Sequence, residues 1–480
     1  MLSKLKFLLF DSSLFRIYYM ICLFFLMVLY VETVAYYSMF VLFYWGVFLS
    51  IYNIFKYKMY KKAYFSFWLF AFLASFAVTT IININSNSDT VFYNFYLLLN
   101  ASICFFMFYC MHAEEGVPFR WELYLIVRIL LFLTTFFIIV GFVLLFLDYS
   151  NQTISVYYDS RLYKGFFTNP NYLGFAAALS IVFCHMLTKP NFIHHSSQKR
   201  VSRIWLFLSF SVSVFSLFLS DSSASLLFLI VYAAIIIILK LLAMTDDVPL
   251  RMIISRIIAL AVGGLILIVM LIFIRSALRL GVSAIFSNGR YLDRDLMEII
   301  SKGELFSFTK DSGYTSRMFL WKAGAEIFKQ YPIFGIGKGN LDALIIEVTG
   351  RKNFNFGIKG MGRLSAADLH NGFYTILVTA GIVGFVIFMV FLIKVIKMLL
   401  PVWYVQRRIM VHSVYPCLLA FIGGYFVYAM FEKALLFDRT YLVYIFWLFL
   451  SYAVCYAKDS GYKRHGDIRI LRSKIPRTII

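Results

Sequence analysis

The stretch Tyr124–Leu147 reads YLIVRILLFLTTFFIIVGFVLLFL and contains a single charged residue. A helix needs about 20 apolar residues to cross the hydrocarbon core of a bilayer, so this run predicts a membrane-spanning helix. The rest of the chain has a similar character, because 62% of its 480 residues are hydrophobic and only 14% are charged. Soluble domains carry about 25% charged residues. The composition therefore excludes a soluble fold.

Twelve apolar runs of this kind predict an all-α polytopic membrane protein with about 12 transmembrane helices. The runs are Leu14–Val31, Val34–Ile51, Ala63–Ile82, Phe92–Met111, Tyr124–Leu147, Pro170–Leu187, Ile204–Leu219, Ser222–Leu242, Ile257–Ile274, Gly372–Ile396, Val411–Met430 and Leu435–Cys455. They divide the chain into 1–147 with five spans, 148–274 with an outer loop and four spans, a large partly helical loop at 275–371, 372–456 with three spans, and a basic tail at 457–480.

Lys and Arg residues predict the orientation of these spans, because cytoplasmic loops carry an excess of them. They gather near the N-terminus, where Arg16 is one of them, in the loops at 56–62, 189–203 and 394–408, and in the tail. Both termini are therefore expected to be cytoplasmic. The net charge of +21 then reflects topology and attraction to anionic lipid headgroups. A nucleic-acid partner gains little support from it.

Two loops on the predicted outer side are long enough to build a site, 148–169 and 275–371. The longer one carries 14 basic and nine acidic residues, against the usual charge bias of outer loops. Long loops also translocate regardless of charge, so an anion site is one of two interpretations. The six cysteines fall in or beside apolar runs, and no metal-ligand spacing appears. We expect no metal site and no cofactor.

Within the longer loop, Ser316–Tyr331 predicts an amphipathic helix that ends before Pro332. Arg317 would lie in its first turn, where a cation is unfavourable unless an anion binds there. The alternative is an arginine that extends to a lipid headgroup. A glycine-spaced turn follows at Pro332–Gly337, and it lacks the spacing of a nucleotide-binding loop.

His370 and Asn371 end this loop at the start of the tenth span. A neutral imidazole at the water boundary could accept a proton, although such a histidine can also be only a polar anchor. In the shorter loop, Arg161 and Lys164 precede Asn169 and Pro170, which form a typical helix start.

These segments together resemble the O-antigen ligases and polymerases of the bacterial envelope. The resemblance rests on Arg161, the Gly-Phe-Phe-Thr-Asn-Pro-Asn start of a span, Ser316-Arg317 with Trp321, Tyr331–Gly337, His370-Asn371 and Gly381–Gly384. It covers roughly 161–396 and implies a fold similar to the GT-C glycosyltransferases.

The resemblance implies transfer of a glycan from an undecaprenyl-pyrophosphate carrier to an acceptor glycan, outside the bacterial inner membrane and without a metal. It implies His370 as the catalytic base, with Arg317 and Arg161 stabilising the pyrophosphate. Further candidates for binding substrate or pyrophosphate are Lys164, Arg290, Arg294, Lys338 and Asn371, although Asn371 and Asn171 are also typical helix-end residues. A flippase and a chain-length regulator are expected partners, besides the bilayer.

Sequence alone leaves the acceptor open. We prefer a polymerase that joins repeat units, and the alternative is a ligase that moves finished glycan to lipid A core or another acceptor. A flippase or transporter is less favoured, because the spans hold almost no charge and no repeated halves appear. The nearest carboxylate to His370 in sequence is Asp368, two residues away. The charged residues Glu432, Lys433, Asp438 and Arg439 could contribute to the site, but membrane-edge charge is the preferred interpretation.

Overall fold

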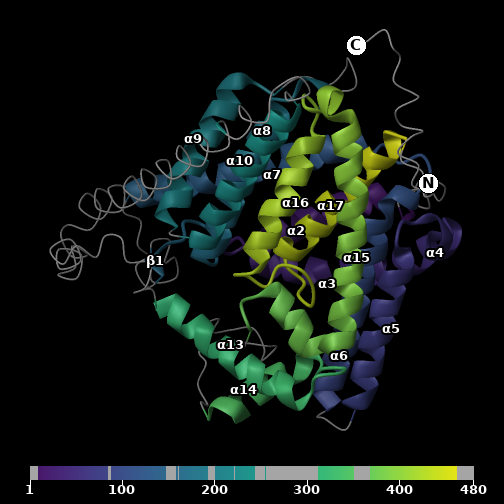
Figure 1. The fold of residues 1–480 in the computed structure, drawn as a ribbon. Coiled ribbons are helices and arrows are strands. Elements are labelled where there is room, and N and C mark those ends of the chain that lie inside the picture. Colours follow the sequence, from purple (N-terminus) through teal and green to yellow (C-terminus); the bar gives the residue numbers. More distant parts are fainter. Residues whose placement is uncertain are drawn as a thin grey trace.

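The computed structural model describes residues 9–84, 88–147, 158–159, 162–192, 201–220, 222–243, 255, 312–350 and 368–461. Helices dominate, as Figure 1 shows, beside one short antiparallel pair of strands. In chain order the elements are α2 (Ser12–Phe25), α3 (Glu32–Lys56), α4 (Met59–Lys62), α5 (Ser66–Ile82), α6 (Ser88–Ser102), η1 (Ile103–Phe108), η2 (Tyr109–Ala113), α7 (Phe119–Phe146), β1 (Tyr158–Asp159), β2 (Leu162–Tyr163), α8 (Pro170–Leu187), η3 (Pro190–Phe192), α9 (Arg203–Leu219), α10 (Ser223–Ala243), α13 (Ser312–Gln330), η5 (Lys338–Asn340), α14 (Leu341–Thr349), α15 (Gly372–Met410), α16 (Tyr415–Ala429) and α17 (Tyr441–Asp459).

The predicted fold class is confirmed. Within the described residues, seven helical segments are long and apolar enough to cross a membrane, and four shorter apolar helices accompany them. These eleven coincide with eleven of the twelve predicted spans. The ninth predicted span, Ile257–Ile274, lies outside the described residues.

Two predicted spans extend six residues beyond the helices found, and α15 continues 14 residues past the predicted end at Ile396. Helix α2 ends at Phe25 rather than near Val31, and α17 begins at Tyr441 rather than Leu435. Residues Ala434 to Phe437 form a loop, although at most 3% of each is exposed. Hydropathy cannot separate a buried apolar loop from a span, and the left-handed φ of +63° at Phe437 prevents a helix here.

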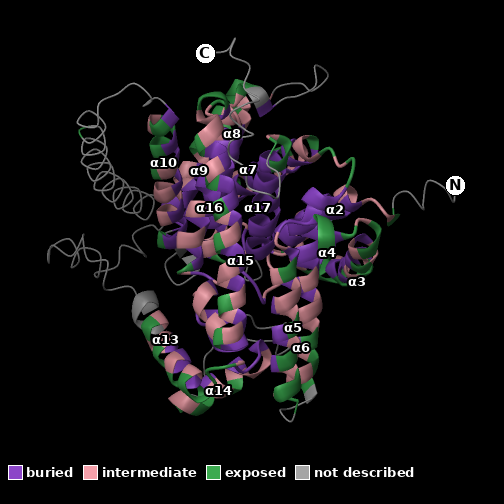
Figure 2. Ribbon diagram, turned by 45° about the vertical axis from the view of Figure 1, so that its right-hand side comes forward, coloured by how far each residue is buried: buried purple, intermediate pink, exposed green. Residues whose placement is uncertain are grey.

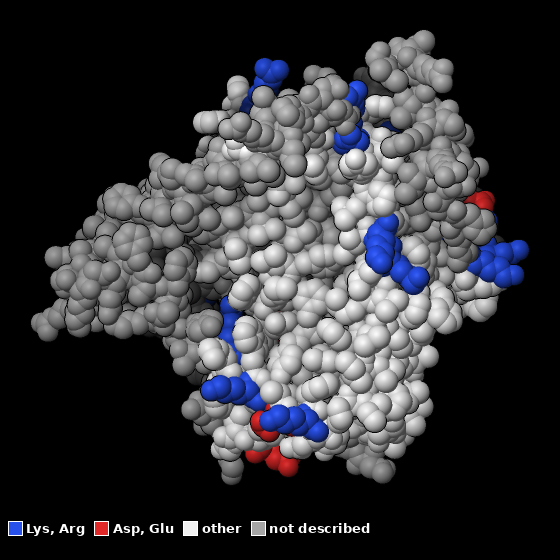
Figure 3. Space-filling model, in the orientation of Figure 1, with Lys and Arg blue, Asp and Glu red and all other residues white. Residues whose placement is uncertain are grey.

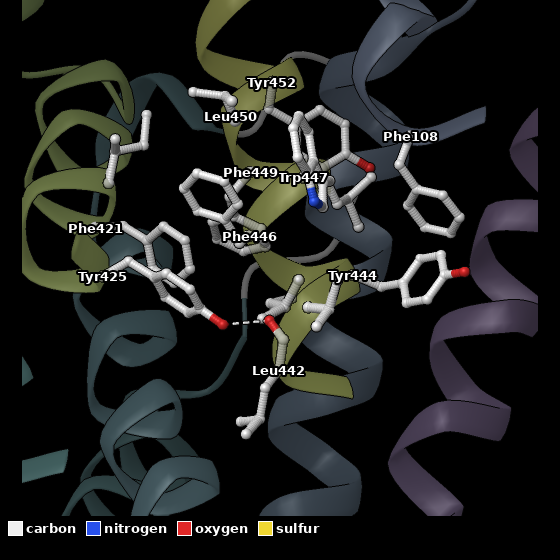
Figure 4. Packing of buried hydrophobic residues seen from close by; sticks show 14 of the residues in the cluster. Phe108, Phe421, Tyr425, Leu442, Tyr444, Phe446, Trp447, Phe449, Leu450 and Tyr452 are labelled. Carbon is white, nitrogen blue, oxygen red and sulfur yellow. Dashed lines mark hydrogen bonds between the residues drawn. The ribbon is translucent and has the colours of Figure 1, made fainter. Parts of the chain in front are cut away.

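Helix α17 forms the centre of the bundle, and 94% of an apolar 18-residue stretch of this helix is buried (Figure 2). Its aromatic side chains pack on those of neighbouring elements, as between Phe421 and Phe449 or Phe108 and Tyr444 (Figure 4). Its indole Trp447 donates a hydrogen bond to the carbonyl of Leu435, 2.9 Å away. The centre of the bundle thus holds the loop between α16 and α17 in place.

Arg16 does not lie on the inner surface with the other basic residues, as the sequence predicts, but inside the helix bundle. Its side chain is fully buried in α2 and donates to Glu122 at 2.7 Å and to Glu114 at 3.0 Å. Tyr452 of α17 donates to the same Glu122 oxygen at 2.9 Å. Buried charges are tolerated when they are paired and hydrogen-bonded in this way.

A smaller layer formed by α13 and α14 covers one end of the bundle (Figure 1). It has its own hydrophobic core, which includes Leu320, Ile327, Ile336, Leu341, Leu369 and Val378. Of these, Val378 belongs to the first turns of α15. The layer is therefore packed on the membrane helices by apolar contacts.

Helix α15 is broken at Gly381, where φ is +66°. The turn Pro332–Gly337 fits into this break: Ile382 N donates to Pro332 O at 2.9 Å, and Gly337 N donates to Thr379 O at 2.9 Å. A Cβ atom on Gly381 would lie 2.2 Å from Ile333 O. Two backbones approach here with no room for a side chain.

We predict that Gly381→Ala destabilises the protein by about 3 kcal/mol or more, because a backbone collision adds to the left-handed strain. Gly350→Ala is the matched control, since its φ is +65° but nothing lies within 4 Å of the added Cβ. That control should cost only about 1 kcal/mol. Thermal unfolding in detergent measures both, and equal losses would contradict the interlock.

Candidate active site

Arg317 lies on α13, and the structure corrects its predicted position. The helix begins at Ser312 rather than at Ser316, so Arg317 is in the second turn and not at the N-terminal end. Its charge is balanced by a carboxylate instead: Arg317 Nη2 donates to Glu432 Oε1 at 3.0 Å. Four residues later on the same helix face, Trp321 Nε1 donates to Leu369 O at 2.7 Å.

Glu432 lies in the loop between α16 and α17 and joins three parts of the chain. Besides Arg317, its Oε1 accepts from Asn171 Nδ2 of α8 at 3.3 Å. Its other oxygen, Oε2, lies 3.6 Å from His370 Nδ1. The Glu432 side chain is only 8% exposed, so its negative charge is directed at these partners. The interpretation of Glu432 as membrane-edge charge is therefore wrong.

His370 is held in an unusual backbone conformation. Its φ is +46°, a left-handed value that costs an L-residue about 1–2 kcal/mol. The flanking residues fix it there, because Leu369 is fully buried and Asn371 Oδ1 caps α15 by accepting from Tyr374 N at 2.9 Å. Gly372 N also donates to Glu432 O at 3.1 Å. The structure thus gives Asn371 a capping position.

The 3.6 Å separation of His370 and Glu432 is longer than a hydrogen bond, and active-site contacts of this kind commonly shorten when substrate binds. A carboxylate facing Nδ1 favours the tautomer with its proton on Nδ1. In that tautomer the lone pair lies on Nε2. This is the arrangement required of a histidine base.

The start of α8 reaches the same carboxylate. Asn169 caps this helix by accepting from Asn171 N at 2.7 Å, and Pro170 occupies the first turn, as predicted. The segment before it is fixed to the end of α2, because Thr168 N donates to Met27 O at 2.9 Å. Lys164 lies within electrostatic reach of Glu32 of α3. Arg161, Arg290 and Arg294 lie outside the described residues.

A second charged group lies beside the first. Asp368 is 3.9 Å from Lys338 Nζ and 3.3 Å from Lys433 Nζ, and Lys433 is 3.1 Å from Asp438. Burial raises the pKa of Asp368, but the charges of Lys338 and Lys433 outweigh it and hold that pKa at about 2. The carboxylates of Asp438 and Asp368 raise the pKa of Lys433 well above its usual value.

Charge is balanced in this cluster, where three cations, Arg317, Lys338 and Lys433, face three carboxylates, Glu432, Asp368 and Asp438. In Figure 3 basic and acidic side chains also lie together over α13 and α14. Lys338 is 5% exposed against Asp368, so a direct phosphate contact would require this pair to separate. Arg317 is 24% exposed and uses one of five guanidinium donors for Glu432. It is the cation best placed to bind an added anion.

Sequence reasoning named Asp368 as the nearest carboxylate and did not identify Glu432 as the partner of His370. The two residues are 62 positions apart, so no local spacing relates them. The available signal was a carboxylate between two predicted spans, on the side predicted to be outside. A charged residue next to membrane spans is expected to pair with a residue of opposite charge.

We predict that Asp368→Asn lowers the free energy of unfolding at pH 7 by at least about 2 kcal/mol. This is the free energy that corresponds to a carboxyl pKa lowered from 3.8 to about 2. A depressed carboxyl pKa stabilises the fold above pH 3.8, and this contribution is lost as the pH falls toward 2. The wild type and the variant should therefore converge over that range in denaturant unfolding. Glu347→Gln, at an exposed site on α14, serves as the control and should match the wild type at every pH.

Comparison with known proteins bears on the family of this site. No curated protein matches the chain. Residues 207–389 match the family model described as O-antigen ligase, and the match includes Arg317, His370 and the interlocked segments Pro332–Gly337 and Gly381–Gly384, but neither Arg161 nor Glu432. The predicted resemblance is confirmed for this part of the chain: residues 207–389 are similar to the O-antigen ligase family.

Proposed function

We propose that this membrane protein is a polysaccharide polymerase of the inner membrane that joins glycan repeat units outside the cytoplasm. The substrate would be a glycan on undecaprenyl pyrophosphate, and the acceptor a sugar hydroxyl of a second glycan. The observation that carries the proposal is that Glu432 brings His370 and Arg317 to one carboxylate. The family supports ligase or polymerase chemistry, and the choice between them is our inference.

In the proposed reaction, His370 Nε2 accepts the proton of the acceptor hydroxyl as its oxygen attacks the anomeric carbon. The bond from that carbon to the pyrophosphate oxygen breaks, and the lipid pyrophosphate leaves with the bonding electrons. Attack on the face opposite the leaving group inverts the configuration. Glu432 would stabilise the imidazolium that forms, as a carboxylate does for a histidine base in other enzymes.

The departing pyrophosphate requires positive charge. Arg317 has guanidinium donors beyond the one bound to Glu432, and a planar guanidinium binds phosphate oxygens bidentately. Because the described cluster carries no net charge, we propose that Arg161 supplies a second guanidinium, with Lys164, Arg290 and Arg294 as further contacts. Fixed cations of this type can replace a metal ion.

A ligase is the second candidate, because the matched family model is described as O-antigen ligase. Its chemistry at His370 and Arg317 would be the same, and only the acceptor would differ. Deletion of the gene separates the two. Loss of a polymerase leaves single capped units, whereas loss of a ligase leaves long unattached polymer on the carrier.

We predict that His370→Ala lowers the rate of glycan transfer by about 10²–10⁴, as loss of a general base does. Arg317→Ala should cost about 10²–10³, and Arg317→Lys should restore little, because an ammonium cannot bind two oxygens in one plane. Glu432→Gln should also reduce the rate and shift the pH profile. Lys329→Ala, at an exposed position on α13, is the control.

Membrane abundance and thermal unfolding must be measured for each of these variants. Near wild-type product length in His370→Ala or Arg317→Ala, at equal abundance, would refute the assignment. For Glu432→Gln, a lower rate with an unchanged pH profile would mean that Glu432 only supports the fold.

We further predict that purified protein elongates lipid-pyrophosphate repeat units in the presence of a chelator. Guanidinium groups rather than a divalent cation would then stabilise the leaving group. Gel analysis of product length measures this directly. A reaction that stops with chelator and resumes on addition of Mg²⁺ would disprove the metal-independent mechanism.

A further inference from the structure

A groove of about 600 Å³ lies between α7 and the start of α9, on elements other than those that meet at Glu432. Its lining is apolar apart from Arg128 and Ser202, and includes Leu125, Ile129, Phe132, Leu133, Val201 and Trp205. The exposed surface beside it is also apolar, since Ile204 and Phe207 of α9 are 80% and 73% exposed. Helix α9 lies at the side of the helix bundle (Figure 1).

Arg128 gives the groove its one charge. The guanidinium lies 5.3 Å from the Tyr124 ring, and among the described residues no carboxylate is within ion-pair distance of it. Its side chain is exposed. An exposed cation in an apolar groove, with no carboxylate beside it in the described part of the chain, is complementary to an amphipathic anion.

The position of Arg128 along α7, relative to the membrane, also fits such a ligand. Helix α7 has 28 residues, about 42 Å at 1.5 Å per residue, whereas the hydrocarbon core is about 30 Å thick. Counting back about 20 residues from Phe146 places the core boundary near Val127. Arg128 therefore lies where lipid headgroups meet acyl chains. Trp205 also lies near its helix start, and tryptophan is enriched at this level of a membrane.

We propose that this groove binds an anionic glycerophospholipid. Its phosphate would contact Arg128 and the Ser202 hydroxyl, and its acyl chains would lie along Ile129, Phe132 and Trp205, where the Phe132 and Trp205 rings are 6.0 Å apart. By the predicted orientation this is the cytoplasmic leaflet. A lipid fits better than a soluble anion, because most of the lining is apolar.

The proposal is tested by native mass spectrometry of the full chain in detergent, with added phosphatidylglycerol or phosphatidylcholine. We expect phosphatidylglycerol to be retained preferentially, with affinity about tenfold lower in Arg128→Ala, the usual effect of losing one charge-assisted hydrogen bond. Arg128→Lys should keep part of the preference, because the charge remains. Lys397→Ala, at an exposed site on α15, removes an equal charge elsewhere and should bind as the wild type does.

Equal retention of the two lipids would overturn the proposal, as would a loss in Lys397→Ala as large as that in Arg128→Ala. Inorganic phosphate that displaces the lipid at similar concentration would identify a simple anion site and also overturn it. Thermal unfolding without lipid checks that Arg128→Ala is folded. Because the readout is lipid binding, its failure is independent of the proposed glycan transfer.

Discussion

The Glu432 carboxylate sets the geometry of the candidate site of this protein. A buried carboxylate costs several kcal/mol unless it is paired, so Arg317, Asn171 and His370 are held where they can satisfy it. These partners belong to α13, α8 and the residue before the cap of α15. The position of Glu432 depends in turn on the aromatic packing around α17, through Trp447 and the loop that it holds (Figure 4). Packing at the centre of the bundle therefore contributes to the position of Glu432 in the candidate site.

Two of the segments that carry the family resemblance have a structural role rather than a chemical one. Pro332–Gly337 and the break at Gly381 are 44 or more residues apart in sequence, and they interlock through backbone hydrogen bonds. Helix α5 adds to this contact, because Thr79 Oγ1 donates to Phe334 O at 2.6 Å. The interlock fixes the turn that follows α13 against α15, and so fixes Arg317 relative to His370.

Among the described residues, Arg16 and Arg317 pair with buried glutamates, and their surroundings separate a structural role from the proposed chemical one. Arg16 is fully buried and divides its donors among Glu122, Glu114, Ser13 and a backbone carbonyl. Nothing remains for a ligand. Arg317 is partly exposed and gives a single donor to Glu432. Sequence position alone assigned the first to the membrane surface, and only its buried partners show that it joins α2 to α7.

The sequence by itself determined the membrane class, eleven helices that match predicted spans and the capped start of α8, and it named His370 and Arg317 as candidates for the site. Hydrophobic runs and helix caps are local signals, so they can be recognised without a fold. Only the tertiary structure decided that α13 begins at Ser312, that Ala434 to Phe437 form a buried loop, and that Glu432 faces His370. Such pairings join residues far apart in the chain, and they depend on how the helices pack.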